Sequence, residues 1–253
     1  MAVILAIPFG IAIGIALGLV GGGGSILAVP VLIYVLGEPV KDATTASLLV
    51  ITVSAMAGAI GHRRHRGVDF RIALSFAGVS ASGAVLGTVL NRGSRPTVIV
   101  AVLAVIMLGA AAAMLRRTGA QASAPPVAGR ALWVRLIPAA FAVGVLTGYA
   151  GVGGGFLIVP VLTLLLGLSL AQAIGTSLVI ITLTSAVGLL AHLQSGGINW
   201  NIALPFAGAA IVGSVIGAHY SARTSRERLT RGFAALVTVI AFALLTSTVA
   251  SLA

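Results

Sequence analysis

The chain contains no cysteine, only four acidic residues and few charged residues of any kind. The absence of cysteine excludes disulfide bonds and thiolate metal sites. Charged residues make up only 8% of the chain, against about 25% in an ordinary soluble domain. Hydrophobic residues make up 59% of the 253 residues, so too few charges remain to cover a water-soluble fold. This composition predicts a membrane protein.

The apolar residues occur in runs of about 20, the length of helix that crosses a hydrocarbon core of about 30 Å. A membrane-spanning barrel would instead show alternating segments of about 10 residues. Because lipid offers the backbone no other partners, we expect the spans to be α-helices. The sequence predicts apolar segments at residues 3–20, 26–37, 43–61, 72–90, 97–115, 132–149, 156–167, 172–192, 201–221 and 233–251.

The second half of the chain repeats the first. Gly18 aligns with Gly148, and the same offset of 130 residues continues without a gap to Thr88 and Ala218. About 28 of the roughly 71 aligned pairs are identical, far more than shared apolar composition produces. We therefore expect a first transmembrane repeat at residues 1–116, a linker at 117–131 and a second transmembrane repeat at 132–253.

Positive charge is distributed unequally between equivalent loops of the two repeats. Residues 62–71 contain four arginines, whereas the equivalent residues 192–201 contain no lysine or arginine. Since cytoplasmic loops are enriched in these residues, we expect the two loops on opposite sides of the membrane. This is the pattern of two inverted repeats of four to five helical segments each, with a cytoplasmic linker and an external N-terminus. The net charge of +11 therefore reflects topology, and no nucleic-acid partner is expected.

Each half contains a glycine cluster followed by a short apolar segment. The clusters comprise Gly21, Gly22, Gly23 and Gly24 in the first half, and Gly151, Gly153, Gly154 and Gly155 in the second. The segments 26–37 and 156–167 correspond to about 18 Å of helix, which is too short to cross the bilayer. We expect broken or re-entrant helices, and such a pair in two homologous halves indicates the substrate site of a transporter.

A helix that begins after glycines is suited to binding an anion. Its first four N–H groups lack acceptors within the helix, and the helix dipole adds about half a positive charge. Glycine lets the backbone approach a ligand closely, and Ser25 adds a hydroxyl. A second polar layer follows at Thr45, Ser47, Thr176 and Ser177. These hydroxyls either line the substrate pathway or form hydrogen bonds within and between helices.

Other small residues recur at every fourth position. Such spacing is typical of close packing between membrane helices. It occurs at Gly10, Gly14 and Gly18, at Ala140, Gly144 and Gly148, and in the pairs Gly83/Gly87 and Gly213/Gly217. We interpret these series as packing positions and the consecutive glycines as part of a binding site.

His62 and His192 are equivalent in the repeat and end the third segment of each half. The simpler interpretation is an interfacial side chain that exchanges protons with bulk water. Gating or proton transfer is the alternative. All four carboxylates lie in predicted connections, so no mid-span carboxylate relay is expected. With no metal-ligand cluster and no nucleophile motif, we expect neither a metal or cofactor nor an enzyme.

The repeated glycine turn resembles a known family. Its residues are Gly21-Gly-Gly-Gly-Ser-Ile-Leu-Ala-Val-Pro30 and Gly151-Val-Gly-Gly-Gly-Phe-Leu-Ile-Val-Pro160, followed by Ala43-Thr-Thr-Ala-Ser-Leu48 and Ala173-Ile-Gly-Thr-Ser-Leu178. These stretches are similar to the TauE/SafE family of membrane transporters, and the resemblance covers nearly the whole chain. It implies a secondary transporter, in the bacterial cytoplasmic (inner) membrane, for sulfite, a sulfonate or another organosulfur anion.

The expected mechanism is alternating access, with a small anionic substrate and membrane lipids as partners. A passive anion channel is the main alternative, because the same donors can line a continuous pore. A non-transporting membrane scaffold is a further alternative. Assembly into a homo-oligomer is also compatible with the sequence.

Overall fold

The computed structural model describes residues 2–63, 68–91, 129–150, 155–192 and 197–225, with isolated residues at 105–112 and 227–239. Its regular elements are all helical, and no strand occurs within these described residues. The predicted all-α class is therefore confirmed. The predicted segments 97–115 and 233–251, and the linker, lie largely outside the described residues.

The helices follow the predicted segments closely in both halves. In the first half they are α1 (Ala2–Val20), α2 (Ser25–Pro30), the π-helix η1 (Val31–Val35), α3 (Val40–Arg63) and α4 (Phe70–Asn91). In the second half they are α6 (Arg130–Ala150), α7 (Gly155–Leu164), α8 (Leu170–His192) and α9 (Trp200–Arg223).

Five of these helices, α3, α4, α6, α8 and α9, are long and apolar enough to cross a membrane. Large apolar side chains cover their outer faces. Val85 on α4 is 68% exposed and Leu204 on α9 is 59% exposed. Such surfaces are costly in water and suited to lipid, because hydrocarbon does not penalise exposed apolar area. The chain is a multi-pass helical membrane protein.

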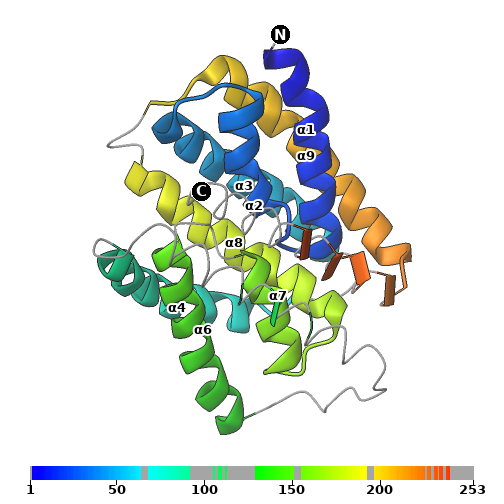
Figure 1. Ribbon diagram of the computed structural model, residues 1–253. Helices are drawn as coiled ribbons and strands as arrows, with labels where there is room; N and C mark the ends of the chain where they lie inside the picture. The colour runs from blue at the N-terminus through cyan, green and yellow to red at the C-terminus, as the bar shows by residue number, and fades with distance from the viewer. Residues whose placement is uncertain are drawn as a thin grey trace.

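The two halves are interleaved. Helix α1 packs along α9, and α4 packs along α6, so each pair joins one helix from each half (Figure 1). The contacts are equivalent under the repeat. Gly217 lies against the carbonyl oxygen of Ile15, and its equivalent Gly87 lies against that of Val145. The prediction of packing positions is confirmed for Gly10, Gly14, Gly18, Gly83, Gly87, Gly144, Gly213 and Gly217, where an added Cβ would meet backbone of the partner helix.

The equivalent helices α3 and α8 cross each other in opposite directions. A Cβ atom at Gly58, late in α3, would lie 3.2 Å from Cδ1 of Leu178, early in α8. A Cβ atom at the equivalent Gly188, late in α8, would lie 3.4 Å from Cδ2 of Leu48, early in α3. Since late residues of each helix meet early residues of the other, the two helices run antiparallel.

Each half buries an aromatic residue in the packing of the other. Phe206 on α9 is fully buried in a cluster with Ile13 of α1 and Leu32 of η1. Its equivalent Phe76 on α4 is fully buried in a cluster that includes Leu136 of α6 and Leu162 of α7. The apolar core thus holds the halves together and sets the positions of the short helices.

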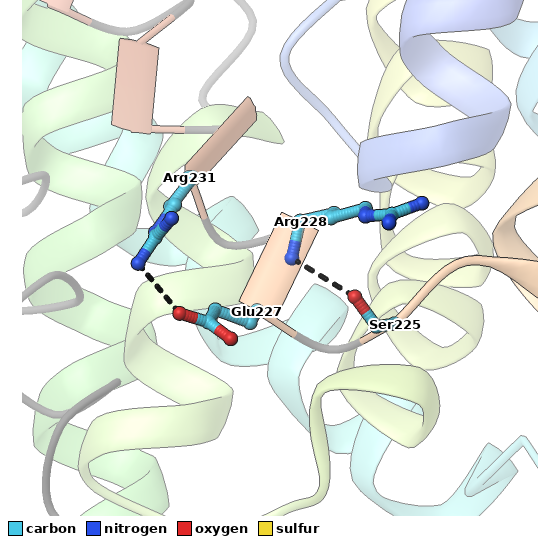
Figure 2. Close-up of polar contacts among 4 residues, drawn as sticks. All are labelled: Ser225, Glu227, Arg228 and Arg231. Atoms are coloured by element: carbon cyan, nitrogen blue, oxygen red, sulfur yellow. Dashed lines mark hydrogen bonds and ion pairs between the residues drawn. The ribbon is translucent and has the colours of Figure 1, made fainter.

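Two contacts join described residues of the basic stretch that follows α9 (Figure 2). The N–H of Arg228 donates to Oγ of Ser225 at 3.4 Å, as at a helix N-cap. Arg231 forms an ion pair with Glu227 at 2.6 Å. Both charged side chains are exposed, so this pair contributes little to the free energy of unfolding.

We expect Gly217→Ala to lower the unfolding temperature of the purified protein in detergent. The new Cβ meets the carbonyl oxygen of Ile15, and overpacking of this kind costs about 1–3 kcal/mol. Gly208→Ala on the same helix is the matched control, because nothing lies within 4 Å of its Cβ. Alanine favours a helix over glycine by up to about 1 kcal/mol, so the control should be neutral or stabilising. Equal effects at the two positions would contradict this packing.

Candidate functional site

The glycine turn that follows α1 reverses the chain inside the protein. Gly21 has a φ of +74°, a left-handed conformation that side chains rarely allow. Its N–H donates to the carbonyl oxygen of Leu17 at 2.8 Å. The chain then returns along α1, since a Cβ at Gly24 would meet the carbonyl oxygen of Ile13 and the amide nitrogen of Leu17. The turn is buried throughout.

The two short helices begin in contact with each other. Helix α2 begins at Ser25 and α7 begins at Gly155, which are equivalent positions in the repeat. A Cβ at Gly22 would meet the carbonyl oxygen of Gly155, and a Cβ at Gly155 would lie 3.0 Å from Oγ of Ser25. The structure therefore brings Gly22, Ser25 and Gly155 together. The predicted site residues Gly151, Gly153 and Gly154 lie outside the described residues.

The short helical segments, α2 with η1 in the first half and α7 in the second, also end in the same way. Gly37 has a φ of +73° and its equivalent Gly167 a φ of +71°, so each stops its helix in a left-handed conformation. The N–H of the next residue donates back to the helix, from Glu38 to Leu32 at 2.9 Å and from Leu168 to Leu162 at 3.1 Å. The repeat is thus preserved in backbone geometry as well as in sequence.

Several N–H groups of the glycine turn have no acceptor among the residues that the structure describes. The backbone bonds that close the turn run from Ser25 N–H to Gly22 O and from Leu27 N–H to Gly24 O, both at 3.2 Å. Within the part of the chain that the structure describes, no acceptor is assigned to the N–H groups of Gly22, Gly23 and Gly24. Buried N–H groups of this kind are rare in folded proteins.

The predicted hydroxyls mostly bond to backbone carbonyls. Oγ of Ser25 donates to Gly22 O at 2.7 Å, and Oγ of Ser47 donates to Thr44 O at 2.8 Å. Oγ of Ser177 donates to Gly21 O, across the two halves, and also lies 2.8 Å from Ile174 O. Ser177 is therefore beside the glycine turn, whereas the bond of Ser47 stays within its own helix.

The threonines of the polar layer, Thr45 and Thr176, are fully buried. Oγ1 of Thr176 accepts a hydrogen bond of 3.2 Å from the N–H of Asp69, which precedes α4. Thr176 thus contacts the connection between α3 and α4, and no bond from it to the glycine turn is seen among the described residues.

His62 differs from the expected interfacial side chain in contact with water. It is 2% exposed, and its Nδ1 lies 3.0 Å from the carbonyl oxygen of Gly58. The burial has a physical reason. Gly58 and Gly61 have no side chains, so α9 packs closely against the end of α3 where His62 lies. Direct exchange of protons with bulk water is therefore not supported for His62. The side chain of His192 lies outside the described residues.

Sequence reasoning missed a buried carboxylate between the halves. Glu38, between η1 and α3, is only 7% exposed, and Nδ2 of Asn199 donates to its Oε1 at 2.9 Å. Asn199 is the repeat equivalent of Asp69, so both residues contact the opposite half. Because α3 and α8 run antiparallel, these two contacts lie at opposite ends of the helix pair. Glu38 falls in a connection, and the sequence offers no signal for its partner.

Together, the long apolar helices and the paired short helices define a multi-pass helical membrane protein with a buried glycine turn. The chain matches the family described as "Sulfite exporter TauE/SafE" over residues 6–244. It belongs to this family, and it is a membrane transporter.

Relatives match over nearly their whole length. The chain is 34% identical to "Probable membrane transporter protein" of Xylella fastidiosa (strain Temecula1 / ATCC 700964), over 94% of this chain and 93% of the relative. It is 28% identical to "Probable membrane transporter protein YunE" of Bacillus subtilis (strain 168), over 86% of this chain and 88% of the relative. No solved structure matches the chain.

We expect Gly22→Ala to reduce substrate flux in reconstituted liposomes by roughly tenfold or more. Its Cβ would meet the backbone of Gly155, which cannot move aside cheaply, and a misfit of 1.4 kcal/mol already corresponds to about tenfold. Gly155→Ala should have a smaller effect, because its nearest contact, at 2.8 Å, is the flexible end of Ile181. Gly208→Ala is the control. Normal flux in Gly22→Ala would show that the two helix starts need not touch.

Proposed function

We propose that the protein is a secondary transporter that moves a small anion across the bacterial cytoplasmic membrane by alternating access. The observation that carries this proposal is the contact between the starts of α2 and α7 inside the protein. Both starts present the positive end of a helix dipole. The turn before α2 adds N–H groups of Gly22, Gly23 and Gly24 without assigned acceptors among the described residues. A buried cluster of donors with partial positive charge is complementary to an anion.

Sulfite, a sulfonate or another organosulfur anion suits this donor set. Such an anion spreads its charge over several oxygens, and each oxygen accepts hydrogen bonds from separate N–H groups. Backbone donors carry only partial charges, so they hold an anion without the strong pairing that an arginine or lysine provides. Weak, multiple contacts favour binding that is followed by release. The family name supports the sulfur oxyanion as the substrate class.

An inverted arrangement of the two halves, with an external N-terminus and a cytoplasmic linker, is part of this proposal. The antiparallel crossing of the equivalent helices α3 and α8 supports it. So do the contacts of Glu38 with Asn199 and of Thr176 with Asp69, which tie the halves together at opposite ends. In alternating access, each end opens in turn while the other stays closed.

Flux in reconstituted liposomes tests the transported substrate. The panel is sulfite, sulfate, thiosulfate, sulfoacetate, taurine and a carboxylate control. We expect saturable uptake and counterflow for one or more sulfur oxyanions, because a site that alternates between two sides is filled and emptied once per cycle. Flux that neither saturates nor shows counterflow would identify a channel. No flux of any member would contradict transport of this substrate class.

Cysteine labelling tests the inverted arrangement. Arg71 and Asn201 are equivalent residues near the starts of α4 and α9, and both are exposed. The chain has no native cysteine, so Arg71→Cys and Asn201→Cys each introduce a single thiol. With an impermeant reagent on oriented vesicles, we expect Arg71→Cys to label from the cytoplasmic side and Asn201→Cys from the other side. Labelling of both from one side would refute the inverted arrangement.

A further inference from the structure

We propose that Ser177 and Ser25 act as positioning residues, which hold two peptide groups of the glycine turn with their N–H groups toward the anion and their carbonyls away from it. This inference rests on the proposed anion site. It gives both hydroxyls a task other than direct contact with substrate.

A peptide group has one polarity, and its orientation decides which charge it presents. In a trans peptide, the carbonyl of one residue and the N–H of the next point in opposite directions. The chain has no cis peptide bond among its described residues. Glycine turns rotate easily, since glycine has access to both signs of φ. Without a constraint, a peptide of the turn can therefore present either its N–H or its carbonyl oxygen to a ligand.

Two consecutive peptides of the turn are constrained through their carbonyls. Gly21 O accepts a hydrogen bond from Oγ of Ser177. Gly22 O accepts from Oγ of Ser25 at 2.7 Å and from the N–H of Ser25 at 3.2 Å. The N–H groups that share these peptides belong to Gly22 and Gly23, and they point away from the hydroxyls. Neither N–H has an assigned acceptor in the described part of the chain.

The hydroxyl of Ser177 is committed to carbonyls and is fully buried. A serine hydroxyl has one proton to donate. While that proton bonds to a carbonyl, it is not available to an anion. The same reasoning holds for the bond from Ser25 to Gly22 O. The hydroxyls thus bind the negative ends of the two peptide dipoles and leave the positive ends for the ligand.

The test separates substrate affinity from turnover. We expect Ser177→Ala and Ser25→Ala each to raise the half-saturation concentration for the transported anion about tenfold, with the maximal rate within about twofold of wild type, because peptides that rotate freely bind the anion less well. Ser54→Ala is the matched control. Ser54 is also fully buried, but among the described residues its hydroxyl bonds only to Val50 and Ile51 of its own helix. It should keep the wild-type half-saturation concentration.

The outcomes distinguish this inference from the proposed function. If the wild-type protein shows no saturable anion flux, the proposed function fails first. If the wild type transports and both serine variants keep its half-saturation concentration, the positioning role is wrong. A fall in maximal rate alone would also overturn it, because that result indicates a structural defect. Should one variant elute as aggregated protein, the other decides, since the two serines act on different peptides.

Discussion

The starts of α2 and α7 meet inside this protein at Gly22, Gly155 and the hydroxyl of Ser25, and the arrangement of the candidate site depends on that contact. Like ends of two helix dipoles repel each other, and the repulsion is stronger at low dielectric than in water. Gly22 and Gly155 allow the approach, because any Cβ at Gly22 would meet the backbone of the opposite turn. An anion between the two starts would offset the repulsion. This compensation is a physical argument for the anionic ligand that we propose.

The interleaved halves provide the rigid frame for this contact. Helix α1 packs along α9 and α4 along α6, with glycines against backbone carbonyls in both pairs. The ends of the α3 and α8 pair are held differently, by the hydrogen bonds of Glu38 with Asn199 and of Asp69 with Thr176. A single hydrogen bond contributes only about 1 kcal/mol. Close backbone packing therefore joins the halves along these two helix pairs, while weaker contacts join them at the two ends of α3 and α8.

Hydroxyl groups near the turn show how much of the site the sequence could predict. The sequence places Ser25 directly after a glycine cluster and Ser177 early in the long segment 172–192, and in the structure both hydroxyls bond to the turn that precedes α2. The acceptor of each hydroxyl was not predictable. Ser177 and Ser47 are equivalent in the repeat, yet only Ser177 bonds across to the glycine turn among the described residues. Local sequence does not specify the acceptor, because a hydroxyl's partner depends on which backbone packs against its helix.

The sequence by itself determined the helical membrane class, the approximate bounds of the helices that the structure describes, the sequence repeat and the packing role of the spaced glycines. These follow from apolar length, from periodicity and from the steric size of single residues, which are local properties. Only the tertiary structure decided that Gly22 touches Gly155, that His62 is buried under α9, and that Glu38 pairs with Asn199. Each of these joins residues far apart in the chain. The physical reason is that burial and hydrogen-bond partners depend on how helices cross, and a linear pattern of residues does not specify a crossing.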